Sequence, residues 1–437
     1  MSATPLADPN RQHLETARTQ IAQGELQKAA LTLNKAQQQS PNDPRVFMLA
    51  GLMAEKAGNL PKAFEALRHA VAISPDWGPG LLELALLLAR QNQFDEAVST
   101  AEKVARIEPN NLVVLAGVID VAHRAGHLDM AVRHLRRGLE LVPGDAQLRR
   151  QLARDLSGQG AHAESVELWS GLIAENPADT ESLLGRVKAH LAAGTPARAV
   201  ADTTTLLELA PGDSVYAYYA ALAHGVTPKH QPPELNRGLF DSLAEMYDQH
   251  MVRGLRYQLP KRVADKILER FPDKKLNLLD LGCGTGLLGV CLGRLDGFLI
   301  GVDISMKMIE QAGRHNVYDR FHHVNLLDAL QETPDAIYDV LAALDVFIYT
   351  GDLTETVPNA LRILVPQGEL IFSCETSDEA GPDMVLQPSG RYAHKRSHVV
   401  ALCKAAGFET VEVEDTVLRY ENNAPVQGFI VTARKAV

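Results

Sequence analysis

The first half of the chain repeats one pattern of apolar and polar positions every 34 residues. Apolar residues recur at helical spacing on both sides of a glycine or asparagine, so each unit is predicted to be two amphipathic helices joined by a tight turn. A small residue five positions after the turn allows the two helices to pack closely, and a proline ends the unit. The three series are Pro41, Pro75, Pro109, Pro143, Pro177 and Pro211; Gly24, Gly58, Asn92, Gly126, Gly160 and Gly194; and Ala29, Ala63, Ala97, Ala131, Ser165 and Ala199.

This periodicity resembles the tetratricopeptide repeat, with six units over about residues 10–213. Ser214–Gly225 is similar to the extra helix that caps such a solenoid, so we expect an all-α array over residues 1–225. The resemblance implies a concave surface that binds a protein or peptide partner.

Three arginines on one predicted first helix are candidates for that binding. Arg149, Arg150 and Arg154 lie on the type of helix that lines the concave side and could bind an acidic peptide or a carboxylate. The alternative is a solvated face with Asp155 and Glu140 as the ionic partners.

A different pattern begins after a proline-rich stretch at residues 226–237, which is predicted to be a linker. From residue 238 to residue 437, strand-like apolar runs alternate with helical segments, which predicts a mostly parallel sheet covered by helices. The last two runs have no helix between them, and Glu421-Asn422-Asn423 reads as a hairpin turn.

The chemistry of this second half centres on the stretch LLDLGCGTGLLG at residues 278–289. A strand followed by a glycine-rich loop and a helix brings the backbone close to a ligand. From Gly284 the letters also satisfy the dinucleotide fingerprint G-x-G-x-x-G. However, Asp280 at the strand end would repel a pyrophosphate and attract an ammonium or sulfonium group. Asp303, at the end of the next strand, suits the ribose hydroxyls of either cofactor.

These motifs resemble those of class I S-adenosylmethionine-dependent methyltransferases. The resemblance rests on DLGCGTG at 280–286, GVDIS at 301–305 and LVPQGEL at 364–370, and it covers about residues 238–435. It implies a Rossmann-like α/β domain with a mostly parallel seven-stranded sheet that ends in an antiparallel hairpin. Together with the repeats, the chain is similar to bacterial tetratricopeptide-repeat methyltransferases.

The resemblance also implies which residues hold S-adenosylmethionine. Asp280 would face the amino end of the cofactor, Asp303 the ribose, and Ile304 or Ser305 the adenine. Asn325 is expected at the adenine amino group, with Asp328 as the alternative. The full set of cofactor-binding candidates is Asp280, Gly282, Cys283, Gly284, Gly286, Asp303, Ile304, Asn325, Leu326 and Asp345.

The acceptor side has weaker signals. The resemblance implies that Asp345, at the end of the fourth strand, lies beside the reactive methyl. The candidate bases for an acceptor that must lose a proton are Asp345, Tyr349, Glu375 and His394. Tyr247 belongs to a segment that resembles the helix closing over the cofactor. Arg391, Tyr392 and His394 share a predicted polar loop that either holds an anionic acceptor or is ordinary surface.

The amino-acid composition limits the kinds of partner and the location that the chain can have. The net charge is −11, and most of the acidic excess lies in residues 231–437, which disfavours nucleic acid. No apolar run is long enough to span a membrane and no secretory signal is visible, so we expect a cytoplasmic protein. The four cysteines lack metal-ligand spacing, and no metal is expected.

The sequence therefore predicts an enzyme that transfers a methyl group from S-adenosylmethionine to an unidentified small molecule or protein. The alternative is a non-catalytic repeat adaptor whose second domain binds the cofactor structurally or as a sensor. An NAD-dependent oxidoreductase is disfavoured by Asp280 and by the final hairpin.

Overall fold

The computed structural model describes residues 8–421 and 424–437, without the side chains of Gln249, His250 and Arg253. It divides into two compact units at Thr195 and Pro196. The division falls inside the sixth predicted repeat, so the end of the array is grouped with the second unit. Asn422 and Asn423 of the predicted hairpin turn lie outside the described residues.

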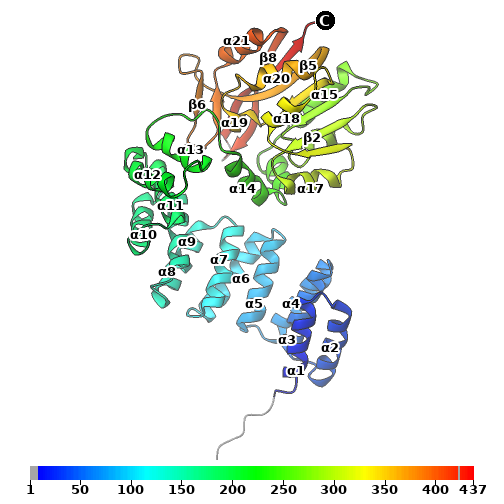
Figure 1. The fold of residues 1–437 in the computed structure, drawn as a ribbon. Coiled ribbons are helices and arrows are strands. Elements are labelled where there is room, and N and C mark those ends of the chain that lie inside the picture. Colours follow the sequence, from blue (N-terminus) through cyan, green and yellow to red (C-terminus); the bar gives the residue numbers. More distant parts are fainter. Residues whose placement is uncertain (1–7, 422–423) are drawn as a thin grey trace, which may run out of the picture. The chain divides into compact units, whose positions relative to one another are not determined.

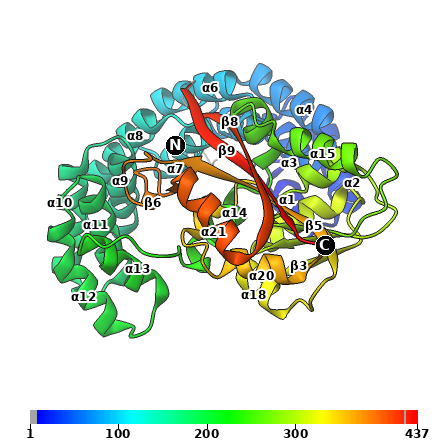
Figure 2. The same ribbon diagram turned by 90° about the horizontal axis from the view of Figure 1, so that it is seen from above.

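The first unit is an array of helices stacked in chain order along a curved path (Figures 1 and 2). Its helices are α1 (Arg11–Ala22), α2 (Leu26–Gln39), α3 (Pro44–Lys56), α4 (Leu60–Ile73), α5 (Gly78–Arg90), α6 (Phe94–Ile107), α7 (Leu112–Arg124), α8 (Leu128–Leu141), α9 (Ala146–Gly158), α10 (His162–Glu175) and α11 (Thr180–Ala192).

The three sequence series have the local structure that the repeat requires. The turn residues all have positive φ, including Asn92 at 59°, where glycine and asparagine are tolerated best. The small residues from Ala29 to Ala199 are fully buried at 0% exposure, so helices pack directly over them. The predicted all-α array is confirmed.

The concave arginines are bound to neighbouring repeats. Arg149 contacts Glu175 at 2.7 Å, and Arg150 contacts Asp179 at the same distance. Arg154 pairs with Glu181. These ion pairs connect α9 to α10 and to the start of α11, so Arg149, Arg150 and Arg154 are not paired with Asp155 or Glu140. Of the predicted ionic partners, Glu140 pairs with Arg137 and Asp155 pairs with His123. Binding of an acidic peptide by the three arginines stays a prediction.

The second unit begins with helical segments and continues as an α/β domain. Its helices are η1 (Pro196–Ala199), α12 (Val200–Leu209), α13 (Ser214–Ala223), α14 (Pro233–Leu243), the π-helix η2 (Gln249–Gly254), α15 (Leu259–Arg270), α16 (Leu287–Leu292), α17 (Met306–Arg314), α18 (Leu326–Glu332), α19 (Phe347–Thr350), α20 (Thr356–Ile363) and α21 (Arg396–Ala406). Its strands are β1 (Leu278–Leu281), β2 (Leu299–Asp303), β3 (Arg320–His323), β4 (Tyr338–Ala343), β5 (Leu364–Thr376), β6 (Met384–Leu386), β7 (Tyr392–His394), β8 (Phe408–Glu421) and β9 (Ala424–Lys435).

The sheet has the predicted parallel body and antiparallel end. Strands β3, β2, β1, β4 and β5 lie side by side in parallel, and β9 pairs antiparallel with β5. Strand β8 pairs antiparallel with β9, and Figure 2 shows the two strands side by side. These seven strands form the predicted α/β fold. The short strands β6 and β7 extend the described sheet to nine, because β7 pairs with the far end of β5.

Alternating residues along the strands fill two cores. Leu278 and Val340 face α15 and α16, whereas Leu279 and Leu341 face α18, α20 and α21. The carboxyl ends of the parallel strands are thus fixed between two packed layers, and loops at those ends can form a site. Over the described residues, no helix is both long and apolar enough to cross a membrane.

Candidate functional site

The glycine-rich loop after β1 turns through conformations that favour glycine. Gly282, Gly284 and Gly286 have φ values of 67°, 53° and 85°. A Cβ on Gly282 would lie 2.4 Å from Val346 Cγ2, so the loop also packs closely against the segment after β4. Gly286 is the N-cap of α16, and Gly282 and Gly284 line a cavity of about 320 Å³.

The last glycine of the G-x-G-x-x-G string has a packing role. A Cβ on Gly289 would lie 2.4 Å from Cε2 of Tyr318, which lies just before β3. The Gly289 amide donates to the Tyr318 hydroxyl at 3.2 Å. Glycine is therefore needed at position 289 because the Tyr318 ring occupies the space beside it. This packing role accounts for the last letter of the G-x-G-x-x-G string without a dinucleotide ligand.

Tyr318 also holds Asp280. Its hydroxyl donates to Asp280 Oδ2 at 2.6 Å, and the carboxyl group is 3% exposed. Burial, opposed by the tyrosine hydrogen bond and reinforced by Asp303, raises the pKa of Asp280 to about 7. Asp280 lies behind the loop, outside the residues that line the cavity. Tyr318 carried no signal in the sequence.

Asp303 ends β2 at the cavity. Its two carboxyl oxygens accept from the amides of Gly284 and Ser305, both at 2.8 Å. Burial raises the pKa of Asp303, and the backbone donors oppose that rise. The hydrogen bond to Gly284 fixes the glycine loop relative to β2. Ile304 lines the cavity beside it.

The segment after β3 forms the next wall. Asn325 Oδ1 accepts from the Leu327 amide at 2.9 Å and thereby caps α18. Asn325, Leu326 and the alternative candidate Asp328 all line the cavity. Cys283 and Gly286 do not; the Cys283 amide donates to the carbonyl of Val302 at 3.0 Å, beneath the loop.

Asp345 occupies a constrained position after β4. Its φ is 55°, its amide donates to Ser373 Oγ at 2.8 Å, and its Oδ2 accepts from Arg419 at 2.9 Å. Burial raises the pKa of Asp345, and the Arg419 charge opposes that rise. Asp345 lines the cavity together with Tyr247 and Tyr349, and burial raises the pKa of both phenols.

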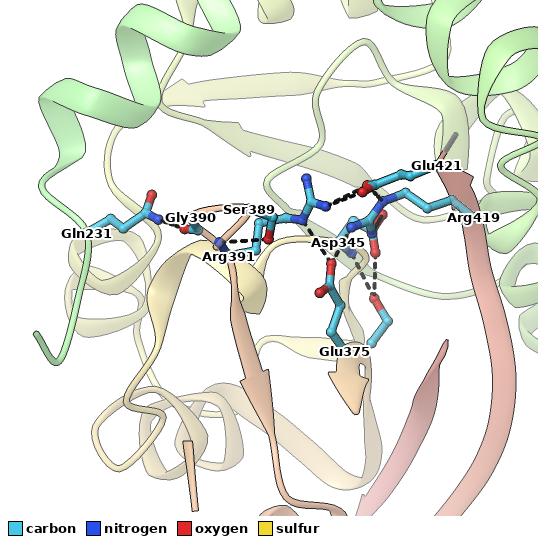
Figure 3. Close-up of polar contacts among 9 residues, drawn as sticks. Gln231, Asp345, Glu375, Ser389, Gly390, Arg391, Arg419 and Glu421 are labelled. Carbon is cyan, nitrogen blue, oxygen red and sulfur yellow. Dashed lines mark hydrogen bonds and ion pairs between the residues drawn. The ribbon is translucent and has the colours of Figure 1, made fainter. Parts of the chain in front are cut away.

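Arg419 belongs to a buried cluster of ion pairs (Figure 3). It contacts Asp345 and Glu421, the latter at 2.8 Å, and it also pairs with Glu375. Arg391 contacts Glu375 at 2.9 Å and Glu421 at 2.6 Å. Two guanidinium groups are thus shared among three carboxyl groups. Nothing in the sequence connected Arg419 with Asp345.

The prediction that residues 391–394 form a polar loop is wrong. Tyr392–His394 is strand β7, and it is buried because it pairs with both β5 and β6. His394 Nε2 contacts the Gly351 carbonyl at 2.6 Å, Tyr392 donates to the Pro228 carbonyl at 2.9 Å, and burial lowers the pKa of His394. The structure does not bring Arg391, Tyr392 or His394 to the cavity wall.

The segment before β1 is tied to the loops of the site. Asp241 accepts from Ser305 Oγ at 2.6 Å, and Asp248 accepts from Thr285 Oγ1. These contacts bring Phe240 and Tyr247 to the cavity. Among the described residues, no group of His, Cys, Asp and Glu side chains could hold a metal ion.

Comparison with known families matches both halves of the chain. Residues 272–414 match a family described as "Methyltransferase domain". Residues 14–76, 150–214 and 79–111 match families described as "Tetratricopeptide repeat".

Curated relatives match the second half. The malonyl-[acyl-carrier protein] O-methyltransferase of Halalkalibacterium halodurans is 33% identical over 144 residues, which is 31% of this chain and 52% of that protein. The ubiquinone biosynthesis O-methyltransferase of Aromatoleum aromaticum is 23% identical over 198 residues, 41% of this chain and 81% of that protein. The chain spans about half the length of the first of these relatives.

Two solved structures resemble the separate halves. Magnesium protoporphyrin IX methyltransferase from Synechocystis, with bound SAH, aligns with a TM-score of 0.37 and 20% identity over 47% of this chain and 99% of that one. The tetratricopeptide protein YrrB aligns with a TM-score of 0.38 and 15% identity over 44% of this chain and 98% of that one. With both family matches and the fold described above, the chain consists of a tetratricopeptide-repeat array and a methyltransferase domain.

Proposed function

We propose that the chain transfers a methyl group from S-adenosylmethionine to an acceptor and releases S-adenosylhomocysteine. The observation that carries this proposal is the cavity that Gly282, Gly284, Asp303 and Asn325 line together, with Asp345 on its β4 side. Asp280 lies behind the glycine loop, outside the lining residues, so it would act on a ligand through its charge and the position of the loop and not by direct contact. The methyltransferase-domain match over residues 272–414 supports the same cofactor.

The described residues fit that cofactor. Gly282 and Gly284 line the cavity, Asp303 has lone pairs left for ribose hydroxyls, and Asn325 Oδ1, which accepts from the Leu327 amide, has a second lone pair for the adenine amino group. S-adenosylmethionine supplies a methyl group on a sulfonium. The acceptor bonds to that carbon while the carbon–sulfur bond breaks, its electron pair remains on sulfur, and a hydroxyl acceptor passes its proton to a base.

Asp345 is the proton acceptor that the geometry supports best. It lines the cavity, whereas His394 lies outside the wall, and the raised pKa of Tyr349 keeps that phenol protonated at neutral pH. Positioning of acceptor and methyl group supplies the rest of the catalysis. We further infer that the repeat array binds a protein or peptide, which is what repeats of this kind generally do.

Calorimetric titration of the full chain with S-adenosylmethionine, S-adenosylhomocysteine and NAD tests the choice of cofactor, and methyl transfer to a mixture of candidate acceptors separates the enzyme from an adaptor that only binds the cofactor. We expect micromolar binding of the first two and none of NAD. Asp303→Ala should weaken binding by about 1–3 kcal/mol because hydrogen bonds to a charged group are lost. Asp296→Ala removes an exposed carboxyl of the same domain and serves as the control.

Each other outcome has a definite meaning. Binding of NAD alone would refute the argument from Asp280. Binding of none of the three would leave the repeat adaptor as the function.

A further inference from the structure

The ion-pair cluster around Arg419 contains unequal numbers of positive and negative groups (Figure 3). Its members are Arg391, Arg419, Asp345, Glu375 and Glu421. With all five side chains ionised, two positive charges are set against three negative ones, so one negative charge is in excess. Glu375 and Arg419 are only 1% and 3% exposed, so water compensates this charge poorly. A further cation beside the cluster would balance it.

Asp345 makes the excess charge accessible from the cavity. Of the five described side chains of the cluster, only that of Asp345 lines the cavity. Its Oδ2 accepts from Arg419 at 2.9 Å. Among the residues that the structure describes, the partner of Oδ1 is Ser373 Oγ, at a distance of 3.5 Å. One carboxyl oxygen is therefore held by the cluster, and the other keeps lone pairs for a ligand.

The carboxyl group of Asp345 is fixed from two strands. The backbone has a φ of 55°, and the amide donates to Ser373 Oγ of β5 at 2.8 Å. Arg419 belongs to β8, so its hydrogen bond holds the side chain from another strand. This arrangement gives Asp345 one orientation relative to the ends of the strands, in the way that a preorganised charge requires.

The strand order determines which part of a ligand Asp345 faces. Asp303 and Asn325 follow β2 and β3, whereas Gly282 follows β1 and Asp345 follows β4, in the order β3-β2-β1-β4. S-adenosylmethionine has adenine and ribose at one end and the sulfonium beyond the ribose. If Asp303 and Asn325 bind the ribose and the adenine, the sulfonium lies toward the ends of β1 and β4.

The charge of the cluster is complementary to that end of the cofactor. We propose that the cluster is a built-in counter-ion for the sulfonium, and that Arg419 is a positioning residue that keeps Asp345 ionised and oriented at the cavity. The inference rests on the proposed function. A proton that passes from the acceptor to Asp345 would cancel the excess charge of the cluster in the same reaction that turns the sulfonium into a neutral thioether.

Other titratable groups near Asp345 decide how the proposal can be tested. Burial raises the pKa of the nearby tyrosines and of Cys374, so these groups stay uncharged up to about pH 8.5. The uncharged set is Tyr247, Tyr257, Tyr349 and Cys374. The titratable groups that share the cavity wall with Asp345 also include His230, Asp303 and Asp328. Asp280 has a pKa of about 7, so proteins are compared with one another at the same pH.

Calorimetric titration of the full chain with S-adenosylmethionine and S-adenosylhomocysteine isolates the sulfonium, because only the first ligand carries that charge. The ratio of the two Kd values measures the preference for the cation. In Arg419→Met, Asp345 loses its closest positive charge and should take up a proton. At about pH 6 the preference for S-adenosylmethionine should be about fivefold or more lower than in the unmodified chain, and it should rise again toward about pH 8.5.

Two further variants separate charge from support of the fold. In an Asp345→Asn background, Arg419→Met should leave the ratio of Kd values unchanged at every pH, because the group that it acts on is gone. Glu375→Gln keeps the shape of the cluster and removes one negative charge. It should act in the opposite direction, with a preference at about pH 5 that is about twofold or more higher than in the unmodified chain. This variant also tests the proposal if Arg419→Met does not fold.

Equal weakening of both ligands, with a ratio that responds neither to pH nor to these charges, would overturn the proposal and leave the cluster as a support of the fold. An effect of Arg419→Met that persists in the Asp345→Asn background would also overturn it. Failure of the unmodified chain to bind either ligand is a different result, because it would refute the proposed function itself.

Discussion

At the scale of the residue, Asp280 combines burial with a hydrogen bond to a single neutral donor. A carboxyl pKa raised to about 7 means that the folded protein holds this proton more tightly than the unfolded chain does. Ionising Asp280 therefore costs stability, and the cost grows as the pH rises from the unfolded-state pKa to about 7 and levels off above it. A cationic ligand that favours the ionised form would offset it.

We predict that Asp280→Asn removes this pH dependence. Between about pH 5 and about pH 8, the free energy of unfolding of the ligand-free variant should rise relative to the unmodified protein by on the order of 2 kcal/mol. Urea denaturation at both pH values measures it. The same variant should bind S-adenosylmethionine at least about tenfold more weakly, a loss of about 1.4 kcal/mol or more. Parallel pH profiles for the two proteins would show that Asp280 is ionised throughout.

At the scale of the element, the fit between α16 and Tyr318 positions the glycine loop. The ring occupies the space that a side chain at residue 289 would need, and its hydroxyl reaches Asp280 at the end of β1. Helix, strand and the segment before β3 are thus joined through one aromatic side chain.

We predict that Gly289→Ala destabilises the second unit by about 1–3 kcal/mol, because the added methyl overpacks a buried contact. It should also weaken S-adenosylhomocysteine binding, because Tyr318 must move away from Asp280. Gly313→Ala is the matched control: a Cβ there would have its nearest neighbour, Phe321 Cε2, at 3.9 Å, and alanine favours the helix. Thermal unfolding and calorimetry measure both effects. Equal behaviour of the two variants would contradict the packing role of Gly289.

At the scale of the whole molecule, the site depends on where the cavity-forming part of the second unit begins. The sequence placed the start of the methyltransferase domain at residue 238, whereas the structure has cavity-lining side chains from His230 onward. A domain cut at the predicted linker would lack part of its own cavity wall.

We predict that a chain starting at Pro196 keeps the cofactor affinity of the full protein within about threefold, or about 0.7 kcal/mol. A chain starting at Gly238 should bind S-adenosylhomocysteine more weakly than the chain starting at Pro196, because the cavity-lining residues His230, Gln231, Pro233 and Asn236 are missing. Calorimetric titration of both fragments with S-adenosylhomocysteine makes the comparison. Equal affinity of the two fragments would show that residues 226–237 are dispensable.

Local patterns in the sequence were sufficient to predict the repeats, the parallel sheet with its antiparallel end, and the glycine loop. These features depend on neighbours in the chain: Asn92 and the glycines adopt positive φ because of their own backbone freedom, and alternating apolar residues form strands between two helical layers. The placement of Asp303 and Asn325 at strand ends follows from the same regularity.

Only the tertiary structure determined the contacts between distant segments. Tyr318 lies 38 positions from Asp280, and Arg419 lies 74 positions from Asp345, so no spacing rule connects them. His394 was misplaced because a polar stretch of sequence became a buried strand once it paired with β5. Residues 226–232 were predicted to be a linker because prolines break local structure, yet hydrogen bonds from Asp352 and Tyr392 hold this segment on the domain. Local propensity acts through adjacent residues, whereas the walls of this site are assembled by packing.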